Sequence, residues 1–145
     1  MRVLTGFPGF LGSALIERLL ARTDDRIVCL VQEQYRDLAE ERAATLIEAA
    51  DGDVAADRIE LVVGDITESV LGLDEGTRER LQRNAVECYH LAAVYDLGVS
   101  RELGTAVNVR GTEHVLDFAE GIADLRRFHY VSTCYVSGRH EGVFS

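Results

Sequence analysis

The chain has 145 residues and a formal net charge of −10 at pH 7, which favour one globular domain and argue against a basic nucleic-acid-binding face. Hydrophobic residues make up 47% of the sequence, enough for a buried core, yet no apolar run approaches the length that crosses a bilayer. No signal peptide opens the chain, so we expect one cytoplasmic domain over residues 1–145, with no membrane or nucleic-acid partner.

Short apolar runs alternate along the chain with longer amphipathic stretches. The runs predict strands buried on both faces, and the stretches predict helices, because their apolar residues recur at helical spacing. The strands are expected at Arg2–Thr5, Ile27–Val31, Ile59–Val63, Val86–Leu91 and Phe128–Ser132, and the helices at Phe10–Ala21, Tyr35–Ala50, Glu75–Asn84 and Arg101–Gly121. This alternation predicts an α/β fold of the Rossmann type, a doubly wound parallel sheet with strand order 3-2-1-4-5. Its ligand crevice would lie at the carboxyl ends of the first and fourth strands.

The first predicted turn, TGFPGFLG, carries glycines at a spacing of three residues. Gly6 ends the strand and allows a tight turn, Gly9 lets backbone approach a bound group, and Gly12 lets the helix pack close to the sheet. Free N–H groups at the helix start, with the helix dipole, attract an anion, although Pro8 contributes no N–H. The turn predicts the diphosphate site of a dinucleotide, and the alternative is a glycine-rich turn without a ligand.

The three cysteines Cys29, Cys88 and Cys134 are widely spaced, and no Cys/His pattern predicts a metal site. Cys29 and Cys88 lie in apolar runs, so we interpret them as buried reduced thiols.

Four more motifs follow the glycine turn. They are GDIT (64–67), HLAA (90–93), NVRGT (108–112) and VSTCYVSG (131–138). In this order the five motifs resemble the extended short-chain dehydrogenase/reductase family over nearly the whole chain. The last three look most like its thioester reductase and fatty acyl-CoA reductase branch. Nucleotide-sugar enzymes of the NAD-dependent epimerase/dehydratase superfamily are the next most similar.

The resemblance implies which residues contact the cofactor. Contacts are expected from Gly6, Phe7, Gly9, Phe10, Leu11 and Gly12 in the turn, Asp65 and Ile66 beside adenine, Leu91, Ala92 and Ala93 beside ribose and diphosphate, and Asn108. From the residues alone, Asp65 could instead cap a turn and Asn108 could have a structural task. We interpret His90 as a core histidine at a strand end, and Arg101 and His114 as surface residues.

The end of the second strand decides the ribose contact, because an acidic residue there favours the free 2′-OH of NAD. Val31 occupies that position and Gln32 follows it. The resembling reductases often carry one Arg at the second position and another about one helix further on. Arg42 fits the latter and Arg36 is close, so we expect NADP, and NAD stays open because Glu33 could reach a 2′-OH.

The resemblance also implies a catalytic Ser or Thr, a Tyr, and a Lys four residues after the Tyr. Aligning VSTCYVSG places Thr133 at the hydroxyl position, with Ser132 as the second choice. No Tyr-x-x-x-Lys pair is present, and Tyr135 with Arg139 lies within the Ser/Thr motif itself and is rejected.

We therefore expect an inactive, truncated cofactor-binding part of an NADPH-dependent reductase whose substrate is a thioester or another small carbonyl compound. One alternative is a fragment of an NAD-dependent epimerase or dehydratase, and another is a non-catalytic NAD(P)-binding protein. The bare edge of the fifth strand predicts a homodimer or a domain-swapped form.

Overall fold

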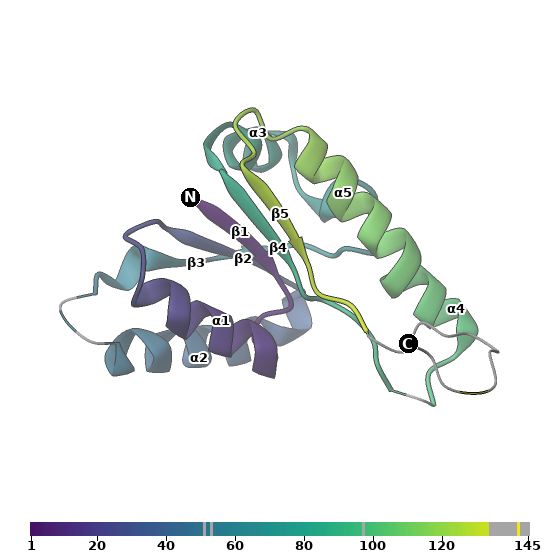
Figure 1. Ribbon diagram of the computed structural model, residues 1–145, viewed down its shortest axis with the longest axis horizontal. Coiled ribbons are helices and arrows are strands. Elements are labelled where there is room, and N and C mark those ends of the chain that lie inside the picture. The colour runs from purple at the N-terminus through teal and green to yellow at the C-terminus, as the bar shows by residue number, and fades with distance from the viewer. Residues whose placement is uncertain (51, 53, 97, 134–141, 143–145) are drawn as a thin grey trace.

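A parallel sheet with strand order β3-β2-β1-β4-β5 forms the centre of the molecule, as predicted (Figure 1). The structure is a computed structural model and describes residues 1–50, 52, 54–96, 98–133 and 142. The strands are β1 (Arg2–Thr5), β2 (Ile27–Val31), β3 (Ile59–Val63), β4 (Glu87–His90) and β5 (Arg127–Tyr130).

The bounds of β1, β2 and β3 agree with the prediction, whereas β4 and β5 are shorter than expected. The ladder between β4 and β5 ends at the pair His90 and Tyr130. One further bond, from the N–H of Val131 to the carbonyl of His90 at 3.0 Å, follows it. Ser132, predicted to lie in the strand, lies beyond it, because β4 supplies no further partner.

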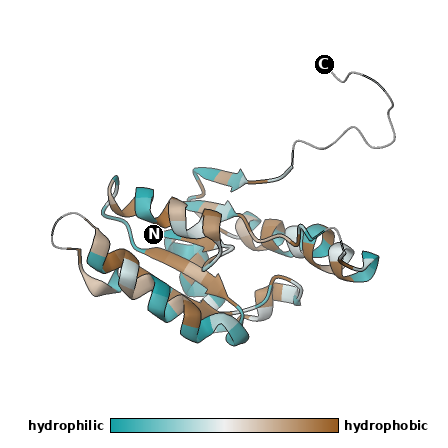
Figure 2. Ribbon diagram, turned by 90° about the horizontal axis from the view of Figure 1, so that it is seen from below, coloured by the Kyte–Doolittle hydropathy of each residue, from teal (hydrophilic) through white to brown (hydrophobic). Residues whose placement is uncertain are grey.

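Helices cover both faces of the sheet. On one face lie α1 (Phe10–Leu20) and α2 (Arg36–Ala49), and on the other lie α3 (Glu75–Asn84) and α5 (Thr112–Glu120) (Figure 1). Neighbouring strand residues alternate between the two cores, with Val3 packing on the side of α3 and α5 and Leu4 on the side of α1 and α2. Hydrophobic residues, drawn in brown, lie in the sheet and in the helices beside it, whereas β4 also carries the polar residues Glu87 and His90 (Figure 2).

The prediction that every strand is buried on both faces is wrong for the edge strands. β2 is buried at all of its positions, but β3 is mostly half-buried, and in β5 Arg127 and Tyr130 are exposed. An edge strand has a neighbour on one side only, so its side chains receive less cover.

The fourth predicted helix contains a change of winding that periodicity did not predict. It consists of α4 (Arg101–Gly104), the π-helical segment η4 (Thr105–Gly111) and α5. Leu103, an apolar residue within this predicted helix, is 48% exposed. Short 3₁₀ segments occur at η1 (Glu33–Tyr35), η2 (Ala56–Arg58) and η3 (Ser69–Gly72). Within the described ranges, no helix combines the length and apolar character needed to cross a membrane.

Candidate dinucleotide site

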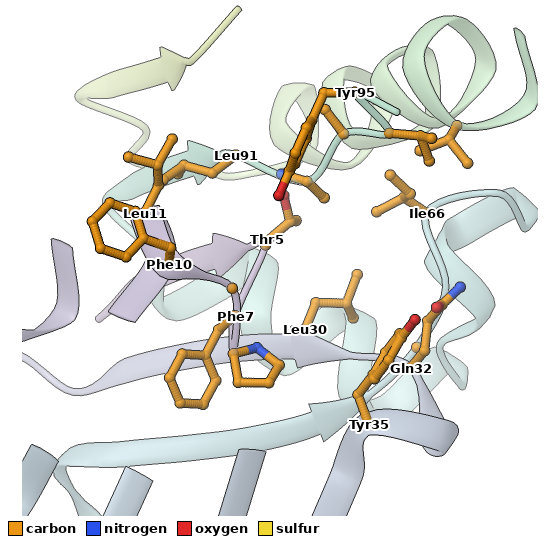
Figure 3. Close-up of a pocket in the computed structure, with 18 of the residues that line it drawn as sticks. Thr5, Phe7, Phe10, Leu11, Leu30, Gln32, Tyr35, Ile66, Leu91 and Tyr95 are labelled. Atoms are coloured by element: carbon orange, nitrogen blue, oxygen red, sulfur yellow. The ribbon is translucent and has the colours of Figure 1, made fainter. Parts of the chain in front are cut away.

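An open cavity of about 800 Å³ lies over the carboxyl ends of the inner strands (Figure 3). Every described residue that lines it is uncharged, although the chain as a whole carries a net charge of −10. An anionic ligand there would meet backbone dipoles and neutral side chains instead of the acidic surface. The lining consists of Thr5, Gly6, Phe7, Pro8, Gly9, Phe10, Leu11, Leu30, Gln32, Tyr35, Leu38, Gly64, Ile66, Thr67, Leu91, Ala92, Ala93, Val94, Tyr95 and Val107.

Most of the predicted cofactor contacts are brought together in this cavity. The predicted residues in its lining are Gly6, Phe7, Gly9, Phe10, Leu11, Gln32, Ile66, Leu91, Ala92 and Ala93. The predicted residues outside the lining are Gly12, Arg36, Arg42, Asp65 and Asn108.

The glycine turn is organised around one carbonyl group. Gly6 has a φ of +97°, and a Cβ there would lie 2.8 Å from the carbonyl carbon of Leu91. The Gly6 oxygen accepts a hydrogen bond from the N–H of Gly9 at 3.1 Å. A Cβ on Gly9 or on Gly12 would lie 2.8 or 2.6 Å from that oxygen. The second and third glycines therefore make room for the turn's own carbonyl, a requirement that the sequence interpretation did not include.

The start of α1 faces this turn. Gly9 is the N-cap of α1 and contributes no side-chain hydrogen bond, and the first turn holds no acidic residue. The first N–H groups of a helix have no partner within it, so they carry a partial positive charge. Gly9, Phe10 and Leu11 line the cavity at this point, which places the anion-binding end of α1 against it.

A polar network closes the cavity beside the ends of β2 and β3. The Nε2 of Gln32 donates to a carboxylate oxygen of Asp65 at 2.6 Å. The other oxygen accepts from the N–H and the hydroxyl of Thr67, each at 2.8 Å. Burial raises the pKa of Asp65, but these hydrogen bonds outweigh it and the net pKa is lowered. Asp65 therefore orders Gln32 and Thr67, which line the cavity, and it caps the turn.

The segment after β4 forms the opposite wall. Both ends of the Asn108 amide bond to Val94: Oδ1 accepts from its N–H at 2.9 Å, and Nδ2 donates to its carbonyl at 2.8 Å. Asn108 thus lies behind the wall and holds Val94, which faces the cavity.

His114 was interpreted as a surface residue, and that prediction is wrong. The ring is half-buried, and Nδ1 lies 2.8 Å from the carbonyl oxygen of Ile66. Gly111 packs on the same residue, since a Cβ there would lie 2.9 Å from Cδ1 of Ile66. The helix therefore fixes a residue that lines the cavity, while Arg101 is exposed as predicted.

Sequence reasoning missed several lining residues, among them Tyr35, Leu38 and Tyr95. Tyr35 and Leu38 are about half exposed and Tyr95 is 92% exposed. Tyr35 lies beside Gln32, and Tyr95 lies across the cavity from them (Figure 3). Tyr35 follows Gln32 by one short 3₁₀ turn, and that proximity to a strand end was the available signal.

The two predicted arginines differ in their surroundings. Arg36 pairs with Glu40 at 3.1 Å and with Glu33 at 4.0 Å. Arg42 is exposed and has no ion-pair partner among the residues that the structure describes. It lies one helical turn beyond Leu38 on the same face of α2.

The predicted catalytic hydroxyls follow β5. Ser132 and Thr133 are exposed and are absent from the described lining of the cavity. Their catalytic role stays a prediction. Cys134, Tyr135 and Arg139 lie outside the described residues. The sequence contains no lysine, so it holds no Tyr/Lys pair.

The fold, the glycine turn and the uncharged cavity define a Rossmann-type dinucleotide-binding domain. Residues 4–145 match the model of the male sterility protein family of NAD-binding domains, and the chain belongs to this family.

Two curated relatives and one solved structure illustrate the similarity. An isonitrile lipopeptide synthase of Mycobacterium tuberculosis is 34% identical over 96% of this chain and 6% of its own length. The chloroplastic fatty acyl-CoA reductase 2 of Arabidopsis thaliana is 26% identical over 97% of this chain and 25% of its own. The terminal R domain from the myxalamid PKS-NRPS biosynthetic pathway is 36% identical, with a TM-score of 0.77 over 92% of this chain and 34% of that one. The chain thus spans about a third of the solved reductase domain.

Proposed function

We propose that this chain forms the cofactor-binding part of an NADPH-dependent reductase that acts on an acyl thioester. The cavity with its glycine turn is the observation that carries the proposal, because it combines an uncapped helix start with an uncharged lining. The family and the named reductases support a reductase more than an epimerase or dehydratase.

The geometry supports a division of tasks along the cavity. The diphosphate would bind at the start of α1, where Gly9 and Phe10 line the cavity. The adenine would lie between Tyr35 and Ile66, at the end formed by β2 and β3. The nicotinamide end would then face the segment after β4, near Tyr95. NADPH, when bound, supplies the hydride that reduces the thioester carbonyl, and the Thr133 hydroxyl would hold the substrate oxygen.

We propose NADPH as the cofactor because neutral Gln32 stands where an acid would select NAD, and its Nε2 is already bound to Asp65. Arg42 is the favoured contact for the 2′-phosphate. Side chains of a helix lean toward its N-terminus, which directs Arg42 over Leu38 at the cavity rim. Arg36, held by two glutamates, is the second choice.

Replacement of Arg42 tests the choice of cofactor. We expect Arg42→Ala to weaken NADP⁺ binding about tenfold and to leave NAD⁺ binding unchanged, because only NADP⁺ loses a charge-assisted contact. Arg22→Ala is the matched control, an exposed arginine beyond the far end of α1. Equal loss of affinity for both dinucleotides would contradict the assignment of Arg42, and preference for NAD⁺ in the natural chain would contradict NADPH.

We also propose that the chain pairs with a second copy through β5. Among the described strands β5 bonds to β4 alone, which leaves its outer edge unpaired, and unpaired edges recruit further strands. Sedimentation velocity is expected to show a concentration-dependent dimer, and a monomer at all concentrations would contradict this. The cytoplasm is the proposed compartment, because Cys29 and Cys88 are free thiols.

A further inference from the structure

A buried relay of hydrogen bonds joins β1, β4 and the helix behind them. The Nδ1 of His90 lies 2.7 Å from the hydroxyl of Thr5, and Nε2 lies 3.1 Å from the hydroxyl of Thr112. His90 has no exposed surface, and Thr5 is 1% exposed. The relay therefore connects three segments of the chain, with Thr5 and His90 shielded from solvent and Thr112 half-buried.

The bonds of this relay have a definite direction. Thr112 donates its hydroxyl proton to the carbonyl of Asn108, four residues earlier in the helix, at 2.9 Å. Its oxygen must then accept a proton from Nε2 of His90, so Nδ1 is the unprotonated nitrogen and accepts from Thr5. The oxygen of Thr5 in turn accepts from the N–H of Ala92 at 3.2 Å.

The relay ends on the wall of the cavity. Thr5 and Ala92 both line it, and the backbone at Ala92 is already in close contact with the glycine turn. A Cβ on Gly6 would lie 2.9 Å from the Ala92 nitrogen. A small movement of this backbone would therefore change the space beside the turn.

The surroundings of His90 favour the neutral ring. Tyr130 of β5 stacks on it with ring centroids 5.5 Å apart, and Cys88 precedes it by two residues on the same face of β4. β1 and α5 contribute the hydroxyls of Thr5 and Thr112. Burial lowers the pKa of His90. A doubly protonated ring would reverse the bond to Thr5 and leave the Thr5 proton without its acceptor.

We propose that His90, held as the Nε2–H tautomer, is a positioning residue that fixes the backbone at Ala92 for the bound dinucleotide through the Thr5 hydroxyl. This rests on the proposed function, since the wall matters only if the cavity binds a dinucleotide. His90 is buried outside the described lining of the cavity and touches no reacting atom.

Two substitutions of His90 separate its two bonds. In His90→Asn the amide oxygen replaces Nδ1 as the acceptor for Thr5, and in His90→Gln the amide nitrogen replaces Nε2 as the donor to Thr112. We expect His90→Asn to keep NADPH affinity within about threefold and His90→Gln to lose about tenfold, because only the former retains the bond toward Ala92. Thr5→Val should resemble His90→Gln.

Thr45→Val is the matched control for the hydroxyl replacements. Thr45 is exposed and donates its hydroxyl proton to the carbonyl four residues earlier, as Thr112 does. We expect this variant to bind NADPH as the natural chain does. An equal loss of NADPH affinity in His90→Asn and His90→Gln, with both variants folded, would mean that His90 is merely a packing residue. This result would overturn the proposal.

The tautomer of His90 can be determined by NMR in the absence of cofactor. A long-range ¹H–¹⁵N spectrum of the imidazole rings should give an unprotonated Nδ1 and a protonated Nε2 for His90, assigned by its loss in His90→Asn. A protonated Nδ1 would overturn the relay. If the natural chain is folded but binds no NADPH, the proposed function fails and the positioning role fails with it. If it binds NADPH and none of the variants changes the affinity, only the positioning role fails.

Discussion

Asn108 holds Val94 by both its backbone groups, with bonds of 2.9 and 2.8 Å from a single side-chain amide. Asn108 lies in the π-helical segment η4, so the change of winding in this helix coincides with the point where the helix is hydrogen-bonded to the cavity wall. π-Helical turns occur frequently at functional sites.

Replacement of Asn108 by Ala removes both bonds to Val94, so the N–H and the carbonyl of Val94 lose their partner. We expect a loss of about 1–3 kcal/mol in the free energy of unfolding and weaker NADPH binding. Chemical denaturation and fluorescence titration measure the two effects. Asn84→Ala is the control, because Asn84 makes one exposed bond to the Arg80 carbonyl and lies on α3. Equal effects of the two substitutions would contradict the role given to Asn108.

Gly12 and Gly104 both lie in helices, and we expect replacement by Ala to change stability in opposite directions at the two positions. At Gly12 the added Cβ meets the Gly6 oxygen at 2.6 Å, whereas at Gly104 the nearest atom, in Val99, is 3.8 Å away. We expect Gly12→Ala to lose about 1–3 kcal/mol of stability through overpacking. Gly104→Ala should gain up to about 1 kcal/mol from helix propensity. Thermal unfolding checks both signs, and a stable Gly12→Ala variant would show that the turn can relax.

The buried cysteines are expected to be unreactive in the folded protein. Burial raises the pKa of Cys88 to about 12 and that of Cys29 still further, so almost no thiolate is present. Alkylation at about pH 8, where a free thiol reacts readily, should label neither residue until the chain is unfolded. Mass spectrometry of the digested protein gives the extent at each site. Labelling of the native protein at the unfolded rate would contradict the packing of β2 and β4.

The hydrogen bonds of the Asp65 carboxylate are expected to stabilise the folded chain by an amount that decreases in acid. Because its pKa is lower in the folded state than in the unfolded state, the contribution is complete above the unfolded value, about 3.9. It is lost as the pH falls toward the folded pKa. We expect Asp65→Asn to be less stable than the natural chain at neutral pH and the difference to shrink in acid.

Urea unfolding at several pH values measures this difference. The control is Asp117→Asn, since Asp117 is exposed on α5 and its side chain has no hydrogen-bond partner among the described residues. A difference between Asp65→Asn and the natural chain that does not change with pH would mean that the charge of Asp65 does not matter.

The sequence predicted the strand order and the bounds of β1, β2, β3 and α3, because burial between two helical layers leaves a strong local pattern. The end of β5 was predicted poorly, because β5 ends where its neighbour β4 ends, and the local sequence of β5 does not contain that information. Periodicity also does not report the exposed position of Leu103 or the π-helical winding of η4, whose Asn108 bonds to the segment after β4.

In the candidate site, the residues of the glycine turn were predicted from their place between a strand and a helix, and those of HLAA from the family resemblance. The roles of His114 and Asn108 depend on partners 48 and 14 residues away, which a local motif cannot identify. Tyr35 lies in the short 3₁₀ segment η1 and Tyr95 in an irregular segment, and neither is long enough for a periodic pattern to distinguish a lining residue from an exposed one.

The most direct test of the central claim is a paired fluorescence titration of NADPH and NADH into the purified chain, with folding verified by circular dichroism. We expect saturable binding of both dinucleotides, tighter for NADPH, and displacement of NADPH by NADP⁺. A folded chain that binds neither dinucleotide would contradict the assignment of the cavity.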